Sequence, residues 1–228
     1  MNARLSAGTV DARMDPVLAD PTGAARSLIV VRQAASTDRT ALVAMFERCT
    51  AETRYRRFHA PVKRIPERYL AEALSGTPLH YALVAWAAQA TEADAGADVD
   101  VGAGVGQRAG HVGPDQEARP PEIVALASCR LIDEGAAELG VLIEDAWQRQ
   151  GLGASLVSDL VAHATEIGLR ILKAQLLTEQ AWIVGLLRPY GACRVGPAGS
   201  GVLHVTMRLG HEDQRRPAPG TAPSRQAG

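Results

Sequence analysis

A strand, a glycine-containing turn and an amphipathic helix follow one another between residues 138 and 167, and this unit constrains the fold more than any other segment. The strand is predicted by the apolar residues within positions 138–144, and the turn is Gln148-Arg149-Gln150-Gly151-Leu152-Gly153. The helix is predicted by apolar residues that recur at helical spacing on one face, namely Leu152, Leu156, Val157, Leu160, Val161, Ala164 and Ile167. A strand followed in this way by a helix is typical of α/β domains.

The turn predicts a phosphate-binding site. The N–H groups of a helix's first turn have no partner within the helix, and the helix dipole places partial positive charge there. Gly151 and Gly153 lack side chains, so a pyrophosphate could approach the backbone closely. A P-loop is disfavoured because Gly-Lys-Ser/Thr is missing from the turn. A dinucleotide fingerprint is disfavoured because it needs a third glycine and an acidic residue at the end of the next strand, 169–177.

The remaining patterns predict a mixed, mostly antiparallel sheet flanked by helices. Helices are expected from an N-cap at Ser36 to Cys49, from Pro66 to Leu74, and from about Glu179 to Pro189. Besides 138–144, strands are expected at Leu28–Val31, Tyr81–Ala87, Glu122–Ile132, Leu169–Leu177, Cys193–Val195 and Val202–Leu209. The segments Glu122–Ile132 and Ala136–Glu144 predict a hairpin that turns at Asp133-Glu134-Gly135.

Composition predicts one domain with loose ends. Residues 27–210 form the domain, residues 1–26 and 211–228 are expected to be disordered tails, and residues 89–121, which are rich in Ala, Gly and acidic residues, are expected to be a flexible insertion. The glycines at 102–106 belong to that insertion, so we do not interpret them as a nucleotide-binding loop. A hydrophobic content of 46% is enough for a packed core.

The same composition argues against several classes of partner. The net charge of −1 gives no reason to expect nucleic acid or a membrane surface, and no apolar run approaches the length that spans a bilayer. Three distant cysteines, Cys49, Cys129 and Cys193, predict a reduced, cytoplasmic protein. Neither these cysteines nor the six histidines have metal-ligand spacing, so no metal is expected.

The turn also resembles a known signature. Gln148, Gly151 and Gly153 match the Gln/Arg-x-x-Gly-x-Gly/Ala acetyl-CoA-binding motif of the GNAT N-acetyltransferase superfamily, and Trp147 matches the aromatic residue that often precedes it. The resemblance extends from about Ser27 to about Leu209. Within the superfamily, the segments 54–58 and 188–192 look like the bacterial protein-lysine acetyltransferase branch.

The resemblance implies an enzyme that moves an acetyl group from acetyl-CoA to a primary amine by direct attack. It places acetyl-CoA against the residues Val141, Leu142, Ile143, Gln148, Arg149, Gln150, Gly151, Leu152, Gly153, Ala154 and Gln180. In that family a bulge parts the motif strand from the next strand and exposes a backbone N–H to the thioester oxygen. Glu138 is the expected general base, with Glu144 as the second choice.

One part of the family pattern is missing. The family's late helix often carries an asparagine and, seven residues on, a tyrosine that serves as general acid; here these positions hold Gln180 and Leu187. Leu187 cannot donate a proton, so a non-catalytic acyl-CoA-binding module stays open as an alternative. The acceptor also stays open between a protein lysine and a small-molecule amine. The basic cluster within residues 54–68 is interpreted as a solvated face, or else as an acceptor or 3′-phosphate contact.

Overall fold

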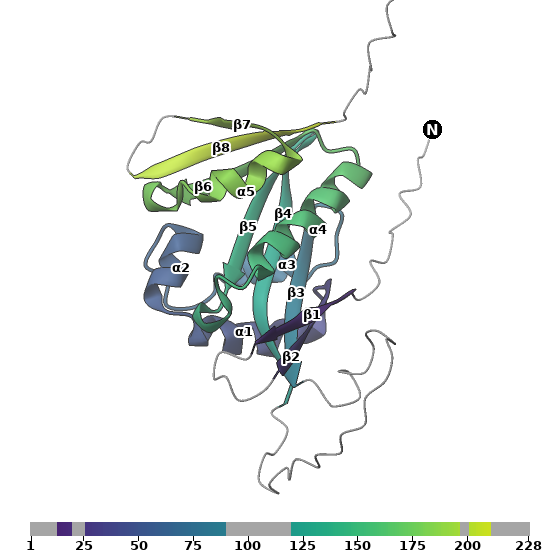
Figure 1. Cartoon of the computed structure of the whole chain (residues 1–228), viewed down its shortest axis with the longest axis vertical. Coiled ribbons are helices and arrows are strands. Elements are labelled where there is room, and N and C mark those ends of the chain that lie inside the picture. Colours follow the sequence, from purple (N-terminus) through teal and green to yellow (C-terminus); the bar gives the residue numbers. More distant parts are fainter. Residues whose placement is uncertain (1–12, 20–25, 90–119, 197–200, 211–228) are drawn as a thin grey trace, which may run out of the picture.

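A single mixed sheet organises the chain (Figure 1). The computed structural model describes residues 13–19, 26–89, 120–196 and 201–210. Eight strands lie in the order β1-β2-β3-β4-β5-β6-β8-β7, and every neighbouring pair is antiparallel except β5 and β6. The strands are β1 (Arg13–Ala19), β2 (Arg26–Gln33), β3 (His80–Gln89), β4 (Glu122–Asp133), β5 (Ala136–Ile143), β6 (Ile171–Leu177), β7 (Gly191–Val195) and β8 (Val202–Leu209). The predicted mixed, mostly antiparallel sheet is therefore confirmed.

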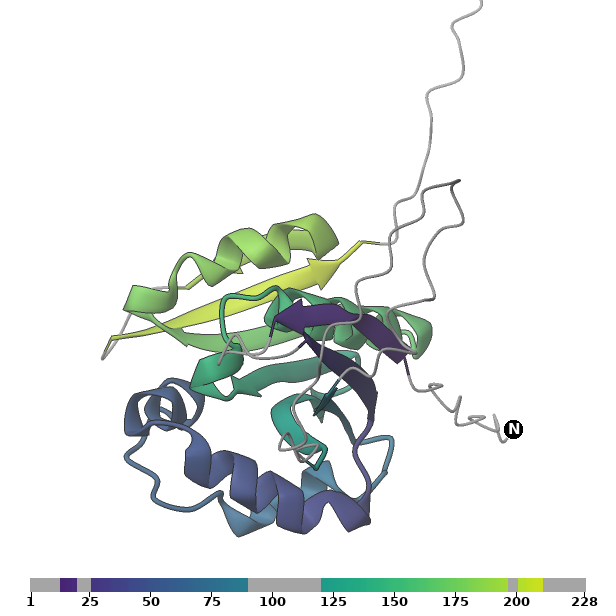
Figure 2. The same cartoon turned by 60° about the horizontal axis from the view of Figure 1, so that its bottom comes forward.

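Helices lie on both faces of the sheet. The α-helices are α1 (Arg39–Arg48), α2 (Ala51–Phe58), α3 (Glu67–Ala73), α4 (Leu152–Glu166) and α5 (Ile183–Leu187). Short 3₁₀ turns are η1 (Ser36–Asp38), η3 (Asp145–Trp147), η4 (Thr178–Gln180) and η5 (Arg188–Tyr190). Figure 2 shows α1 and α5 on opposite sides of the sheet.

Two hydrophobic cores follow from this arrangement. Residues of α1 and α3 pack with one face of β3, β4 and β5, where Leu142 is buried. Residues of α4 and α5 pack with the other face, which also includes β6 and β8. Because both faces of β4 are covered, its residues from Ile123 to Cys129 are all buried, which explains why this stretch of the sequence is apolar except for Ser128.

The predicted helix of the motif unit is confirmed in α4. Leu152, Leu156, Leu160, Val161 and Ala164 are buried there, as the spacing predicts. Ile167 is an exception: it follows the last helical residue and is 43% exposed, because the chain turns there toward Gly168 and β6.

Three predictions about the N-terminal half need correction. Residues 13–19 form β1 by pairing with β2, so this part of the expected tail 1–26 is ordered by a sheet edge. Ser36 is the first residue of η1 and does not cap a helix. The carboxylate of Asp38, the last residue of η1, accepts the N–H of Ala35 at 2.8 Å. Helix α2 was not predicted at all.

Other parts of the predicted boundaries cannot be compared. Residues 1–12, 20–25, 90–119 and 211–228 lie outside the described residues. They contain most of the rest of the first tail, most of the insertion and all of the second tail. Within the described part, no helix is both long and apolar enough to cross a bilayer.

The strands β5 and β6 part soon after they meet. Their parallel register includes only Ala136 with Ile171, Ala137 with Leu172, and Glu138 with Lys173. Beyond Glu138, β5 continues beside β4 as far as Ile143, while β6 continues beside β8. The expected separation of the two strands is therefore present. It occurs without a bulge in β5, whose register with β4 is continuous from Ala137 to Ile143.

The buried side chain of Leu142 holds β5 against the α1 side of the sheet. Leu142 is 2% exposed, so Leu142→Ala should lower the free energy of unfolding by about 2–5 kcal/mol through lost transfer energy and a cavity. Leu79→Ala is the matched control, because Leu79 is 62% exposed, and we expect a change within about 0.5 kcal/mol. Urea unfolding measures both, and equal losses would contradict this account of the core.

Candidate active site

The turn before α4 has the geometry of an anion site. Arg149 and Gly151 both have positive φ, 61° and 88°. The first α4 hydrogen bond of this region joins the N–H of Ser155 to the carbonyl of Gly151 at 3.1 Å. No acceptor within the described ranges bonds to the backbone N–H groups of residues 149–154. These donors stand at the positive end of a helix of 15 residues, so they can bind a phosphate group.

The two glycines of the turn serve different purposes. Gly151 adopts φ of 88°, and a Cβ there would point into open space. Gly151 is thus needed for the backbone conformation. A Cβ on Gly153 would lie 3.2 Å from Cδ1 of Ile143, so this glycine allows α4 to pack closely on β5. Leu152 is buried in the core, so only its N–H can face a ligand.

Gln148 ties the turn to α2. Its Nε2 donates to Oγ1 of Thr53 at 3.1 Å and to the carbonyl of Ile143 at 3.0 Å. Next to it, the carboxylate of Asp145 accepts the N–H of Thr50 at 2.8 Å and the hydroxyls of Thr50 and Thr53 at 2.8 and 2.7 Å. Burial opposes ionisation of Asp145, but these hydrogen bonds outweigh it and lower its pKa. The Gln148 side chain therefore positions the turn.

The gap between β5 and β6 contains a cavity of about 240 Å³. Its wall includes Glu138, Leu139, Gly140 and Val141 of β5, together with residues of α2, α4, β6 and α5. Gln180 also lines it, and Oε1 of Gln180 accepts the N–H of Leu177 at 3.1 Å. Leu187 lines the cavity too and is 2% exposed, whereas Tyr190 is not among the lining residues.

Strand alternation directs the N–H groups of Val141 and Ile143 toward the gap, beyond the last β5–β6 pair of the described residues. The carbonyl of Gly135 accepts from Ile171 of β6, and the N–H of Glu144 donates to Val124 of β4. Odd-numbered residues of β5 therefore direct their peptide groups toward β6, and even-numbered residues direct theirs toward β4. Val141 is odd-numbered and lies beyond the last β5–β6 pair, so its N–H faces the gap. A donor of this kind is what a developing oxyanion requires.

Glu138 lies in the cavity wall, as the sequence leads one to expect for a base. Its Oε2 accepts Nη2 of Arg130 at 2.6 Å, and its side chain is 32% exposed. The second choice, Glu144, is paired with Arg48 at 2.9 Å and is not among the lining residues. Of the two carboxylates, only Glu138 faces the site.

Two further residues line the cavity. Arg57 belongs to the basic cluster for which the sequence left an acceptor contact open, whereas His59 was missed as a functional residue because α2 was not predicted. His59 ends α2 in a left-handed conformation, with φ of 51°, and its Nε2 is buried without a hydrogen-bond partner among the described residues. Burial, and then the charge of Arg57, lower the pKa of His59, so its imidazole is neutral at pH 7. A neutral imidazole with a free nitrogen in a cavity can accept a proton.

Two residues of the basic cluster, Arg56 and Arg68, have carboxylate partners. Arg56 pairs with Glu52 and, at 3.0 Å, with Glu179. Arg68 pairs with Glu72 at 2.8 Å and is 90% exposed. These contacts agree with a solvated face for that part of the cluster. In the described part of the chain, no group of three or more His, Cys, Asp or Glu residues could hold a metal ion.

The comparisons with known proteins agree with this geometry. The family model described as the acetyltransferase (GNAT) family matches residues 106–188. The GNAT domain of PAT from S. lividans is 19% identical, with a TM-score of 0.57 over 87% of this chain and 97% of that one. The structure of yncA from Salmonella typhimurium with its cofactor acetyl-CoA is 17% identical, with a TM-score of 0.51 over 83% and 98%. Among curated proteins, none matches the sequence.

The fold places a turn with free backbone amides beside the gap between β5 and β6. The fold is that of the GNAT acetyltransferases, and residues 106–188, which the family model matches, include the turn before α4.

A negative charge introduced into the turn before α4 tests whether the turn binds the phosphates of acetyl-CoA. Gly151→Asp should abolish acetyl-CoA binding, because it strains a position with φ of 88° and adds negative charge beside the free amides. Gly76→Asp is the matched control: Gly76 has φ of 63° and open space around its Cβ, but lies between α3 and β3. Calorimetry measures both. Normal affinity in Gly151→Asp would mean that the ligand binds elsewhere.

Proposed function

We propose that the protein transfers the acetyl group of acetyl-CoA to a primary amine that enters the cavity between β5 and β6. The observation that carries the proposal is the continuity of two features: the amide-lined turn at residues 149–154 and the N–H of Val141 at the gap. The first suits the pyrophosphate and the second suits the thioester oxygen. The end of β5, formed by Val141, Leu142 and Ile143, leads from the gap to the turn. The pantetheine arm of acetyl-CoA would lie along this part of the strand.

The proposed roles follow the positions of the groups. The turn residues from Arg149 to Ala154 bind through backbone N–H groups, while Gln148 holds the turn in place. Leu142 takes part only through its backbone, because its side chain lies in the opposite core. The N–H of Val141 stabilises the oxyanion, and such a donor contributes about 3 kcal/mol. Glu138 accepts the proton of the attacking amine with Oε1, since Arg130 occupies Oε2.

The leaving thiolate has no evident acid in this proposal. Leu187 replaces the expected tyrosine and is buried. Tyr190 is not among the cavity-lining residues, so it does not substitute for it. Departure as a thiolate that takes its proton from water completes the reaction: the new C–N bond forms, the C–S bond breaks, and the ammonium proton leaves through the base. The absence of an acid at position 187 equally favours the second candidate, a non-catalytic acyl-CoA-binding module.

The acceptor and the location belong to the proposal as well. Either a protein lysine or a small amine satisfies the chemistry described so far. The three cysteines of the chain are free, two of them buried, which supports a reducing, cytoplasmic location.

The role of Glu138 predicts a loss of turnover without a loss of binding. Glu138→Gln should lower kcat/KM for amine acetylation about 10²- to 10⁴-fold, because it removes the proton acceptor, and should leave acetyl-CoA affinity unchanged. Glu134→Gln, in the exposed turn between β4 and β5, is the control and should leave both unchanged. Acetyl-CoA binding with no turnover of any amine by the native protein would instead support the binding module.

His59 should set the acid limb of the pH profile. Its pKa lies below the ordinary value of 6.5, so kcat/KM should stay level down to about pH 6.5 and fall below it as the imidazole gains a proton. A cationic His59 would attract the carboxylate of Glu138, which lines the same cavity, and so weaken Glu138 as the proton acceptor. His59→Gln should remove this limb, as measured by initial rates between pH 5 and 8. An unchanged limb would mean that the charge of His59 does not control the rate.

A further inference from the structure

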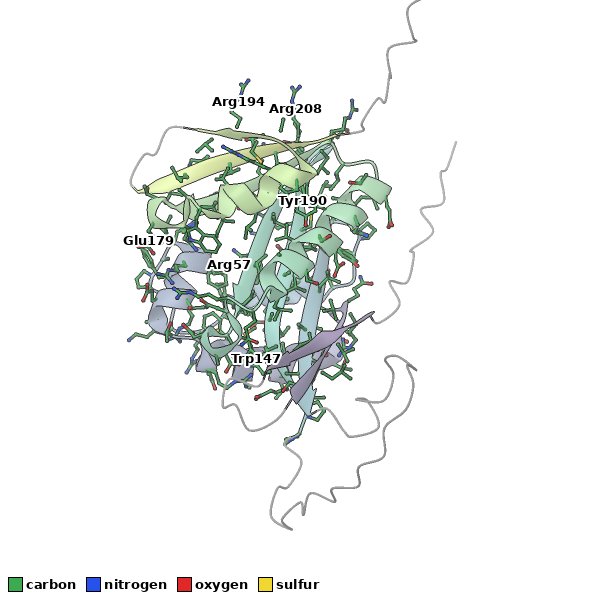
Figure 3. The ribbon with its side chains drawn as sticks, in the orientation of Figure 1. Arg57, Trp147, Glu179, Tyr190, Arg194 and Arg208 are labelled. Atoms are coloured by element: carbon green, nitrogen blue, oxygen red, sulfur yellow. The ribbon has the colours of Figure 1, made fainter. Side chains whose placement is uncertain are left out.

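The guanidinium of Arg57 occupies a niche that a missing side chain creates. A Cβ on Gly140 would overlap Nη2 and Cζ of Arg57, so the arginine lies directly on the backbone of β5. Figure 3 shows Arg57 in the space between α2 and β5. Glycine in the interior of a strand is unfavourable and commonly marks a close approach by another group. Gly140 and Arg57 therefore form one structural feature.

Arg57 has no anionic partner in the described part of the chain. Its Nε is buried without an acceptor among the described residues. Its Cζ lies over the ring faces of Phe58 and Tyr69, 5.0 and 4.9 Å from their centroids. Other arginines near the site are paired, for example Arg56 with Glu179 and Arg130 with Glu138. A partly buried cation without a counter-ion is costly unless a ligand supplies the charge.

Arg57 lies close to the place where the proposed reaction would occur. It lines the same cavity as Glu138 and His59. It lies over Gly140, one residue before the N–H of Val141, and consecutive Cα atoms are about 3.8 Å apart. An anion on Arg57 would thus lie only a few bonds from an amine that attacks a carbonyl held by Val141.

We propose that Arg57 recognises the carboxylate of the acceptor, and that the acceptor is a small amine carrying a carboxylate a few bonds from its nitrogen. The planar fork of a guanidinium suits a carboxylate through two parallel hydrogen bonds. The rings of Phe58 and Tyr69 hold the fork in the cavity without consuming its donors. The inference deepens the proposed acetyl transfer and rests on it for the identity of the reaction.

The test compares acceptors that differ only in charge. Glycine, β-alanine and 4-aminobutyrate are each paired with the corresponding carboxamide, and acetylation is followed as CoA release. For at least one pair, Arg57→Gln should lower kcat/KM for the carboxylate about 10- to 100-fold more than for the carboxamide. Taking the ratio of native protein to variant for each acceptor cancels the difference in amine basicity.

Two further variants separate charge, geometry and general effects. Arg57→Lys keeps the charge but loses the fork, so it should recover only part of the preference for carboxylates. Arg64→Gln, an exposed residue of the same basic cluster, should leave the preference as it is in the native protein. Equal losses for carboxylates and carboxamides in Arg57→Gln would overturn the proposal. A lysine peptide without a nearby acidic residue gives a second test. The proposal would also be overturned if the native protein and Arg57→Gln acetylated this peptide equally well, and both acetylated it faster than the amino acids.

Binding measurements keep this inference separate from the proposed reaction. Calorimetry of the CoA-saturated protein with the same amino acids should show binding that Arg57→Gln abolishes, even if none of them is acetylated. No binding and no acetylation of any of the three would overturn the inference, while acetyl-CoA binding and turnover of another amine would leave the proposed function standing. If acetyl-CoA itself fails to bind, the proposed function fails. A large loss of acetyl-CoA affinity in Arg57→Gln would assign the arginine to the cofactor instead.

Discussion

The short contact between β5 and β6 is the constraint on which the site depends. The two strands are parallel, so a crossover must join them, and α4 is that crossover. Its N-terminus necessarily lies near the end of β5, where the strands have already parted after Glu138 and Lys173. The free amides of the turn and the N–H of Val141 that faces the gap therefore have one cause. A longer β5–β6 ladder would close the cavity and leave the turn as an ordinary loop.

A second set of contacts connects the two sides of the cavity. Asp145 precedes the turn and holds Thr50 and Thr53 at the start of α2, and Gln148 reaches Thr53 from the turn itself. Hydrogen bonds to a charged group contribute about 1.5–3 kcal/mol each, which is substantial for an eight-residue helix that would not be stable alone. The helix that carries Arg57 and His59 thus owes its position to the loop that precedes α4.

This dependence explains what the sequence could and could not predict. Local periodicity and turn residues predict the β4–β5 hairpin, the turn and α4. The fold and the part of the cavity wall around Glu138 could therefore be predicted from the sequence. The hairpin register also pairs Arg130 with Glu138 directly across the strands. Helix α2 is polar and short, and its first residues are fixed by Asp145, 92 to 95 positions away. No local pattern reports such a contact, so Arg57 and His59 could not be assigned to the cavity.

The charges of the cavity wall bear on how an amine could approach. Arg130 occupies one oxygen of Glu138, His59 is neutral, and Arg57 is unpaired among the described residues, so the wall is positive before anything binds. An isolated ammonium would be repelled there. An amine that brings its own carboxylate would enter with no net charge, neutralise Arg57, and leave Glu138 and His59 as the groups nearest its protons. The positive charge that favours deprotonation of the bound amine would thus disfavour an acceptor that carries only an ammonium group.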